Sequence, residues 1–158
     1  MQKIGPCLWF DGQAEEAASF YVSVFKNSKI LGTNYYQEGM PRPAGSVLTV
    51  RFLLDGEEFV ALNGGPHFKF SPAFSFIAHC DSQAEVDELW RKLSAGGEEG
   101  QCGWVTDRFG VSWQVVPDEF LDMLERQDGA ASQRALAAMM QMTKLDIAAL
   151  RRAYENEA

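Results

Sequence analysis

The sequence predicts an α+β fold made of two βαβββ halves followed by short helices. A five-residue pattern occurs twice, as Asp-Gly-Gln-Ala-Glu at residues 11–15 and as Asp-Ser-Gln-Ala-Glu at residues 81–85. Each copy follows an apolar, strand-like run and precedes apolar residues at helical spacing. After Pro117 the composition shifts to Ala, Leu, Met and Glu, which are good helix formers. The chain is therefore a repeated unit with a helical extension.

In the first half, a helix is expected from the repeated motif to about residues 26–28, with Asp11 as its N-cap. Residues 47–54 then alternate as a strand with one packed face does. The dipeptide Asp55-Gly56 favours a tight hairpin that returns as a second strand. A loop rich in Gly and Pro follows, and it places the boundary between the halves near residues 63–72.

The second half repeats this order. Its helix is expected to begin with Asp81 as N-cap and to end near Gly96, where glycine suits a left-handed C-cap. A short strand at residues 104–107 and a turn precede residues 110–117, which alternate with Trp113 on the packed face and Gln114 on the other. Pro117 cannot donate to a continuing ladder and ends this strand.

Three helices are expected in the extension, at residues 118–126, 132–142 and 143–154. Thr143 and Asp146 approximate a capping box at the start of the last one. A chain of 158 residues is expected to form one domain, with a first module at 1–66, a second at 67–117 and the helical extension at 118–158.

The charge balance narrows the class of partner. The formal net charge is −8 and the pI is about 4.7, so a nucleic-acid surface or a basic membrane-binding face is not expected. No signal peptide or bilayer-length apolar run is evident, which favours a cytoplasmic protein with no membrane partner. Cys7, Cys80 and Cys102 lack the short spacing of zinc sites and are expected to be reduced thiols.

Several motifs together resemble one family. They are the paired repeat, Leu-Asn-Gly-Gly-Pro-His-Phe at 62–68, Cys-Gly-Trp at 102–104 and Gly-Val-Ser-Trp-Gln at 110–114. The chain resembles the PhnB-like branch of the glyoxalase/bleomycin-resistance/dioxygenase, or vicinal oxygen chelate, superfamily, whose members often carry the name 3-demethylubiquinone-9 3-methyltransferase. The resemblance implies one curved sheet with outer helices, a small molecule in its concave cup, and a homodimer.

The resemblance, combined with the strand alternation, assigns side chains to this cup. The expected ligand-binding residues are Trp9, Thr49, Arg51, Ser75, His79, Ser112 and Gln114. Superfamily members typically bind a divalent metal through the first and last strands of each module. Here those positions hold Ile4 or Gly5, Ser75, Val60 or Ala61, and Gln114. Because only Gln114 among them is a plausible ligand, we expect no metal and no other cofactor.

Three hypotheses about function remain open. The first is metal-independent binding of a small molecule. The second is an enzyme, and it has three forms. His67 or His79 could act as general base, a metal could bind at His79 and Gln114, or the protein could have the methyltransferase activity of the family name. The methyltransferase form is disfavoured because Gly64-Gly65 is not followed by a helix pattern. The third hypothesis is an interaction module without a ligand.

Individual residues carry alternatives of their own. Arg51 either clamps an anionic ligand or forms an ion pair at the rim, and His67 either serves the pocket or anchors its loop. Cys7 and Cys102 are either nucleophiles or inert thiols. Asn63 is either a turn residue or a polar contact to the ligand.

Overall fold

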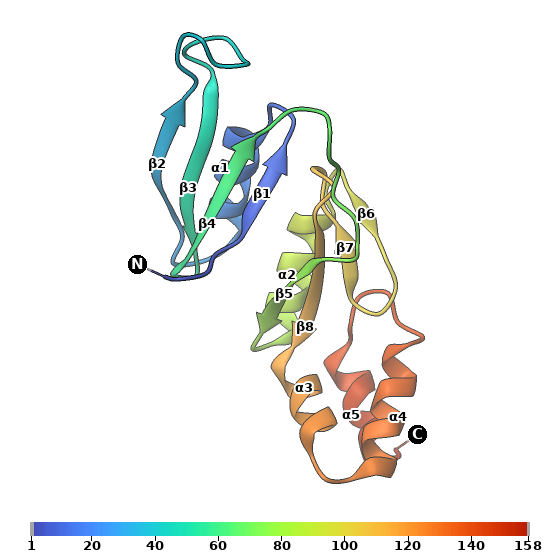
Figure 1. Ribbon diagram of the computed structural model, residues 1–158. Helices are drawn as coiled ribbons and strands as arrows, with labels where there is room; N and C mark the ends of the chain where they lie inside the picture. Colours follow the sequence, from blue (N-terminus) through green and yellow to red (C-terminus); the bar gives the residue numbers. More distant parts are fainter. Residues whose placement is uncertain (1, 158) are drawn as a thin grey trace. The chain divides into compact units, whose positions relative to one another are not determined.

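A computed structural model describes residues 2–157 of the chain (Figure 1). The chain divides between Phe70 and Ser71 into two compact units, and each contains one complete βαβββ module. The α+β class, the paired modules and the C-terminal helices are confirmed. The expected continuity of the two sheets as one curved sheet stays a prediction, as do the domain limits at 1–66, 67–117 and 118–158.

The described part of unit 1, residues 2–70, contains four strands and one helix. They are β1 (Cys7–Phe10), α1 (Ala14–Val24), β2 (Lys29–Tyr35), β3 (Val47–Leu54) and β4 (Glu57–Asn63). The sheet order is β1-β4-β3-β2, with β1 parallel to β4 and the other neighbours antiparallel. The first and last strands of the module are therefore neighbours, and the hairpin β3–β4 forms the centre of the sheet.

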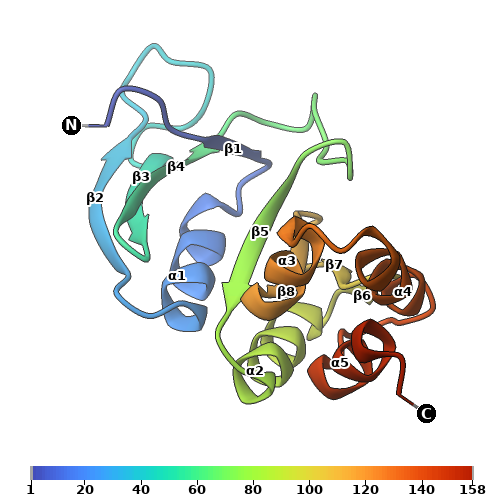
Figure 2. The ribbon, with the colours of Figure 1, turned by 90° about the horizontal axis from the view of Figure 1, so that it is seen from below.

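Helix α1 covers one face of this sheet (Figure 2). Tyr21 of the helix is fully buried and stacks on Phe52 of β3, with ring centroids 6.4 Å apart. The buried side chains of β1 and β3 alternate with partly exposed ones, as the sequence pattern predicted. The opposite face of the sheet has no helix within the described part of this unit.

The hairpin predicted at Asp55-Gly56 is confirmed. Asp55 has φ 49° and Gly56 has φ 82°, and positive φ at both positions is what a two-residue type I′ turn requires. Strand β2, by contrast, is the first of the three strands expected after the helix, but no local pattern indicated its residues. Its pairing with β3 shifts register between Ile30 and Gly32 and again between Asn34 and Tyr35, so its side chains do not keep a simple period of two.

The N-caps assigned to Asp11 and Asp81 are wrong, because both helices begin later. The N-cap of α2 (Gln83–Ser94) is Ser82, whose hydroxyl accepts a hydrogen bond from the Glu85 amide at 3.2 Å. The N-cap position of α1 is Gln13, which makes no side-chain cap. Instead, the Ala14 amide donates to Oδ1 of Asn63 at 2.8 Å. A residue 49 positions away thus satisfies the start of α1.

Asn63 connects three parts of unit 1 and is only 6% exposed. Its Nδ2 donates to the Val47 carbonyl at 3.0 Å, and its own carbonyl accepts from the Tyr36 hydroxyl at 2.6 Å. The end of β4, the start of β3 and the start of α1 are therefore tied together by one side chain. Asn63 is thus the last residue of a strand and not the turn residue of the first alternative, and its contact to a ligand stays a prediction.

Unit 2 repeats the topology and adds the extension. Its elements are β5 (Ser75–Cys80), α2, β6 (Glu98–Glu99), β7 (Trp104–Thr106), β8 (Ser112–Pro117), α3 (Asp118–Glu125), α4 (Gly129–Met139) and α5 (Ile147–Glu155). The sheet order β5-β8-β7-β6 matches that of unit 1 strand for strand. The edge strand β6 completes the predicted βαβββ module but has only two residues, and no local pattern indicated them. No helix among residues 2–157 has the length and apolar character needed to cross a bilayer.

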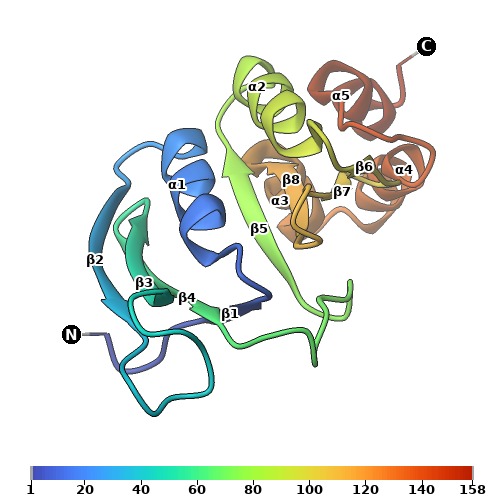
Figure 3. The ribbon, with the colours of Figure 1, turned by 90° about the horizontal axis from the view of Figure 1, so that it is seen from above.

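Helices α3, α4 and α5 pack together at the end of β8 (Figure 3). Their core joins the last strand to all three helices through six buried side chains: Val116, Phe120, Met123, Ala135, Leu145 and Leu150. The predicted capping box at Thr143 is wrong. Asp146 is itself the N-cap of α5 and accepts from the Ala149 amide at 3.0 Å.

The extension is attached to α2 by polar contacts. Gln83 accepts from the Ile147 amide at 2.8 Å through Oε1 and donates to the Leu145 carbonyl at 3.0 Å through Nε2. Lys144 lies 2.8 Å from Asp87 on the next turn of the same helix. Between α3 and α5, Arg151 donates to both carboxylate oxygens of Glu119.

Acid should loosen the extension. Hydrogen bonds from Lys144 and Gln83 lower the pKa of Asp87, and a hydrogen bond from Arg151 lowers the pKa of Glu119. Both pKa values are lower in the folded state, so their stabilisation is complete above an unfolded pKa of about 4 and is lost as the pH falls through the folded values. Amide exchange in α5, corrected for intrinsic rates, should accelerate below that pH. Asp87→Asn with Glu119→Gln should remove most of this pH dependence; an unchanged profile would contradict it.

Replacing Asn63 should destabilise unit 1. Asn63→Ala leaves the Ala14 amide and the Val47 carbonyl without their partner, which costs about 1–3 kcal/mol of unfolding free energy. Asn63→Asp keeps the acceptor for Ala14 and should cost less. Urea unfolding measures both, and Asn34→Ala is the matched control because Asn34 makes one exposed hydrogen bond. Equal effects of Asn63→Ala and Asn34→Ala would contradict the role of Asn63.

Candidate functional site

In unit 1, the face of the sheet opposite α1 carries side chains from β1, β3 and β4. Strand register arranges them in two rows, Trp9–Leu62–Thr49 and Cys7–Val60–Arg51. We call these six residues the module 1 face. The predicted residues Trp9, Thr49 and Arg51 therefore share one face, together with the apolar Val60 and Leu62.

Trp9 is held by the loop after β4. Its indole Nε1 donates to the Gly65 carbonyl at 2.8 Å, and its ring meets Phe68 edge-on with centroids 5.0 Å apart. A Cβ at Gly64 would collide with the indole ring, so glycine is required for this close approach. The glycine pair of this loop thus positions a tryptophan and leads to β5, whereas a nucleotide-binding loop would lead to a helix.

The polar residues of the module 1 face already have protein partners. Arg51 Nε donates to Oε1 of Glu58 at 2.7 Å, so of the two alternatives for Arg51 the structure shows the ion pair. Thr49 Oγ1 accepts from Asn34 Nδ2 at 3.1 Å. Because Glu58 offsets the charge of Arg51, this face offers an anion little net attraction.

In unit 2, the corresponding face has a more polar character. We call it the module 2 face, and its side chains come from β5, β7 and β8: Ser75, Ile77, His79, Trp104, Thr106, Ser112, Gln114 and Val116. Gln114 donates through Nε2 to Ser75 Oγ at 3.0 Å. Ser112 pairs in register with Ser75 but is only 3% exposed. The register thus brings Ser75, Ser112 and Gln114 together on one face, and their role in ligand binding stays a prediction.

The two candidate catalytic histidines belong to different units. His79 is on the module 2 face, and its Nδ1 lies 3.1 Å from Oδ1 of Asp118, the first residue of α3. The His79 side chain is 55% exposed. His67 is exposed in the loop that positions Trp9. Of the two, His79 therefore has the carboxylate partner that orients an imidazole.

The pKa values of the Cys7 and Cys80 thiols are raised. Cys80 is 1% exposed, and burial raises its pKa to about 12, with added repulsion from Glu85, Asp118 and Asp81. Cys7 is exposed, yet partial desolvation also raises its pKa. Cys102 is half-buried in a turn with φ 62°. Because reactive cysteines have lowered pKa values, the structure favours inert thiols at Cys7 and Cys80.

The positions of the superfamily's metal ligands do not fit a metal. The matching registers of β1 with β4 and of β5 with β8 equate Gly5 with Ser75 and Val60 with Gln114. Gly5 and Val60 have no side-chain donor atoms, and the neutral Gln114 and Ser75 are bonded to each other. Within residues 2–157, no three His, Cys, Asp or Glu side chains gather as metal ligands. The donor set itself is unsuited to Zn²⁺, Ni²⁺ or Fe²⁺.

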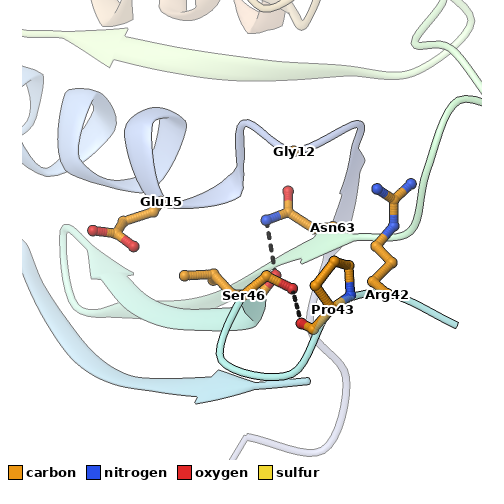
Figure 4. Close-up of a pocket in the computed structure, with 7 residues that line it drawn as sticks. Gly12, Glu15, Arg42, Pro43, Ser46 and Asn63 are labelled. Atoms are coloured by element: carbon orange, nitrogen blue, oxygen red, sulfur yellow. Dashed lines mark hydrogen bonds between the residues drawn. The ribbon is translucent and has the colours of Figure 1, made fainter. Parts of the chain in front are cut away.

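A cavity of about 240 Å³ lies elsewhere in unit 1, beside the start of α1 (Figure 4). It is lined by Gly12, Glu15, Arg42, Pro43, Ser46, Val47 and Asn63. None of the seven residues of the predicted ligand-binding set is among them, although Asn63, the alternative polar contact, is. Arg42 pairs with Asp11 at 3.5 Å, and Ser46 donates to the Pro43 carbonyl at 2.6 Å. Because this wall depends on the loop between β2 and β3, no sequence pattern indicated it.

The paired βαβββ modules, with their first and last strands adjacent, define a glyoxalase-like protein of the vicinal oxygen chelate class. The sequence model of the family described as 3-demethylubiquinone-9 3-methyltransferase matches residues 2–116. The chain belongs to this family, in the PhnB-like branch of the superfamily. The matched residues end just before α3, so the extension lies outside them.

Solved structures agree. The PhnB protein of Bacillus cereus, whose name includes the same methyltransferase, is 35% identical over 73% of this chain and 99% of its own, with a TM-score of 0.68. Protein PA1353 of Pseudomonas aeruginosa is 25% identical over 74% and 98%, with a TM-score of 0.61. FosX, a fosfomycin resistance protein of Listeria monocytogenes determined with Mn(II) and sulfate, is 16% identical over 72% and 90%, with a TM-score of 0.51. At 16% identity, the likeness to FosX shows a shared fold alone. No curated protein matches the chain.

Proposed function

We propose that this protein binds a small molecule without a metal, on the strand faces that the module helices leave uncovered. The observation that carries the proposal is the replacement of metal donors at the equivalent positions of both modules. Gly5 and Val60 supply none, and Gln114 supplies an amide bonded to Ser75. A site that has lost its ligands but keeps a sheet face of mixed polarity suits binding by packing and hydrogen bonds.

The composition of the two faces supports this proposal. The module 1 face offers Trp9 beside Val60 and Leu62, and the module 2 face offers Ile77 beside Gln114 and Ser75. Apolar area with a few hydrogen-bonding groups is typical of small-molecule sites. The predicted ligand-binding set, Trp9, Thr49, Arg51, Ser75, His79, Ser112 and Gln114, remains the proposed set, with Arg51 acting as part of its ion pair.

A homodimer in the cytoplasm remains part of the proposal. Exposed apolar side chains gather on the edge strand β2, where Ile30 is 40%, Leu31 is 37% and Tyr35 is 49% exposed. Such residues at a sheet edge favour coverage by another chain. The predictions that neither nucleic acid nor membrane is a partner rest on the acidic charge.

An enzyme is the second candidate, and the pairing of His79 with Asp118 favours it. A carboxylate that accepts the Nδ1 proton fixes the tautomer and leaves Nε2 as the basic nitrogen. The methyltransferase activity of the family name has less support, because the glycine pair after β4 holds Trp9 and precedes a strand. His67 has no carboxylate partner within the described chain and is the weaker base.

Metal removal should leave the protein unchanged. Native mass spectrometry of protein purified with Mn²⁺, Zn²⁺ and Ni²⁺ should show no stoichiometric metal. The affinity for small molecules, measured by tryptophan fluorescence, should be the same before and after a chelator. FosX of Listeria monocytogenes, whose structure was determined with Mn(II), is the positive control. A chelator-sensitive metal at one per chain would overturn the proposal, and a failure of every small molecule to bind would favour an interaction module.

If the enzyme hypothesis holds, substitution of His79 should abolish turnover. A metabolite extract incubated with the wild-type protein should then show a time-dependent gain or loss of a compound by mass spectrometry. His79→Gln should stop it, and Asp118→Asn should slow it about 10²-fold or more because the base loses its orientation. His67→Gln is the matched control and should retain the rate. Turnover that persists in His79→Gln would rule out His79 as the base.

A further inference from the structure

The four tryptophans of the chain differ in how their indole N–H groups are satisfied. Those of Trp9, Trp90 and Trp113 donate to Gly65 O, Glu99 Oε1 and Asp107 Oδ2 at 2.8, 2.7 and 2.9 Å. The indole of Trp104 has no hydrogen-bond partner and no aromatic neighbour within residues 2–157. A half-buried tryptophan usually finds a partner for this donor, so Trp104 stands out.

Strand register places Trp104 beside Gln114. Trp104 of β7 pairs with Gln114 of β8, and Gln114 pairs with Ile77 of β5. Residues directly opposite each other in a sheet project from the same face, with Cβ atoms roughly 5 Å apart in antiparallel pairs. One row across the module 2 face is therefore Ile77–Gln114–Trp104, and Ile77 is 49% exposed.

The side-chain amide of Gln114 is oriented by one hydrogen bond and has further donor and acceptor capacity. Its one hydrogen bond within the described chain is from Nε2 to Ser75 Oγ, 3.0 Å away. A glutamine amide has two N–H donors and an acceptor oxygen, so one donor and Oε1 remain. With the Trp104 N–H, the row offers two donors and one acceptor beside an indole ring and an isoleucine.

The row itself holds no charged side chain, whereas the neighbouring row, Ser75–Ser112–Thr106, ends at the exposed Glu98 of β6, whose carboxylate disfavours an anionic ligand. Burying a charged ligand against neutral groups costs more than burying an uncharged one, because the charge loses its hydration. A planar ring makes the largest contact with an indole and carries its polar atoms in its own plane, where an adjacent amide can reach them. The row thus favours a ligand that is both planar and uncharged.

We propose that Trp104 and Gln114 form a subsite for an uncharged planar ring, which packs on the indole and pairs a polar edge with the amide. This rests on the proposed function and deepens it by naming the ligand class. Trp104 is a specificity residue of this subsite. His79, in the next row along β5, lies at the border of the subsite.

Three matched probes test the proposal: benzamide, its charged analogue benzoate, and its non-planar analogue cyclohexanecarboxamide. Titration into ¹⁵N-labelled protein should shift the Trp104 indole N–H and Gln114 side-chain signals with benzamide, at the millimolar affinity expected of a small fragment. Benzoate and cyclohexanecarboxamide should bind at least tenfold more weakly. Equal binding of benzoate, or shifts confined to other residues, would overturn the proposal.

Variants of Trp104 distinguish the contribution of the aromatic ring to binding from that of the indole N–H donor. Trp104→Leu should weaken benzamide binding at least tenfold, and Trp104→Phe, which keeps a ring but loses the donor, should fall between Leu and wild type. Trp90→Phe is the matched control, since that indole bonds to Glu99 on the helix side. The indole shift of Trp104 in the wild-type protein needs no variant and tests the subsite even if Trp104→Leu does not fold.

The outcomes distinguish this inference from the proposed function. If Trp104→Leu binds benzamide as the wild type does, the subsite is wrong, while metal-independent binding at other residues still stands. If neither the probes nor any metal-free small molecule binds the wild-type protein, both fail. If the probes bind only when a divalent metal is added, the proposed metal-independent binding is wrong.

Discussion

The parallel pairing of the first and last strands of each module determines what every other residue can do. β1 pairs with β4 and β5 pairs with β8 in the same register, so the two modules correspond position by position. Once that register is set, alternation directs one set of side chains under the helix and leaves the other set on the uncovered face. A shift of one residue would exchange Trp113 with Gln114 and bury the amide in the core.

Position-by-position correspondence shows how far the two modules have diverged. Trp9 occupies the position of His79, and Arg51 occupies that of Trp104. The same backbone therefore presents an ion-paired cation in one module and an unpartnered indole in the other. Asn63 and Pro117 also correspond, because each ends its module's last strand. Asn63 closes its module onto α1, whereas Pro117 leads into α3 and lets the chain continue as the extension.

The sequence could predict whatever depends on local periodicity. The packed and uncovered faces of β1 and β3, and the hairpin at Asp55-Gly56, follow from alternation and turn chemistry alone. On β8, by contrast, Gln114 is the one residue that is not buried. The sequence could not predict the partner of the Ala14 amide, because Asn63 is distant in the chain and resembles an ordinary turn residue. The free indole of Trp104 was hidden for the same reason: only the pairing of β7 with β8 shows which face it shares.

Gln83 is one of the residues by which the repeat is recognised, yet its contacts have no counterpart at Gln13. Its side-chain amide accepts from the Ile147 amide and donates to the Leu145 carbonyl, two residues apart. Those are the bonds that a neighbouring β-strand would make to an extended segment. The side-chain amide of Gln83 thus binds the extension with the two hydrogen bonds that a backbone peptide group would make. A module boundary drawn at the end of the family's matched region would cut through a continuous hydrogen-bonded structure.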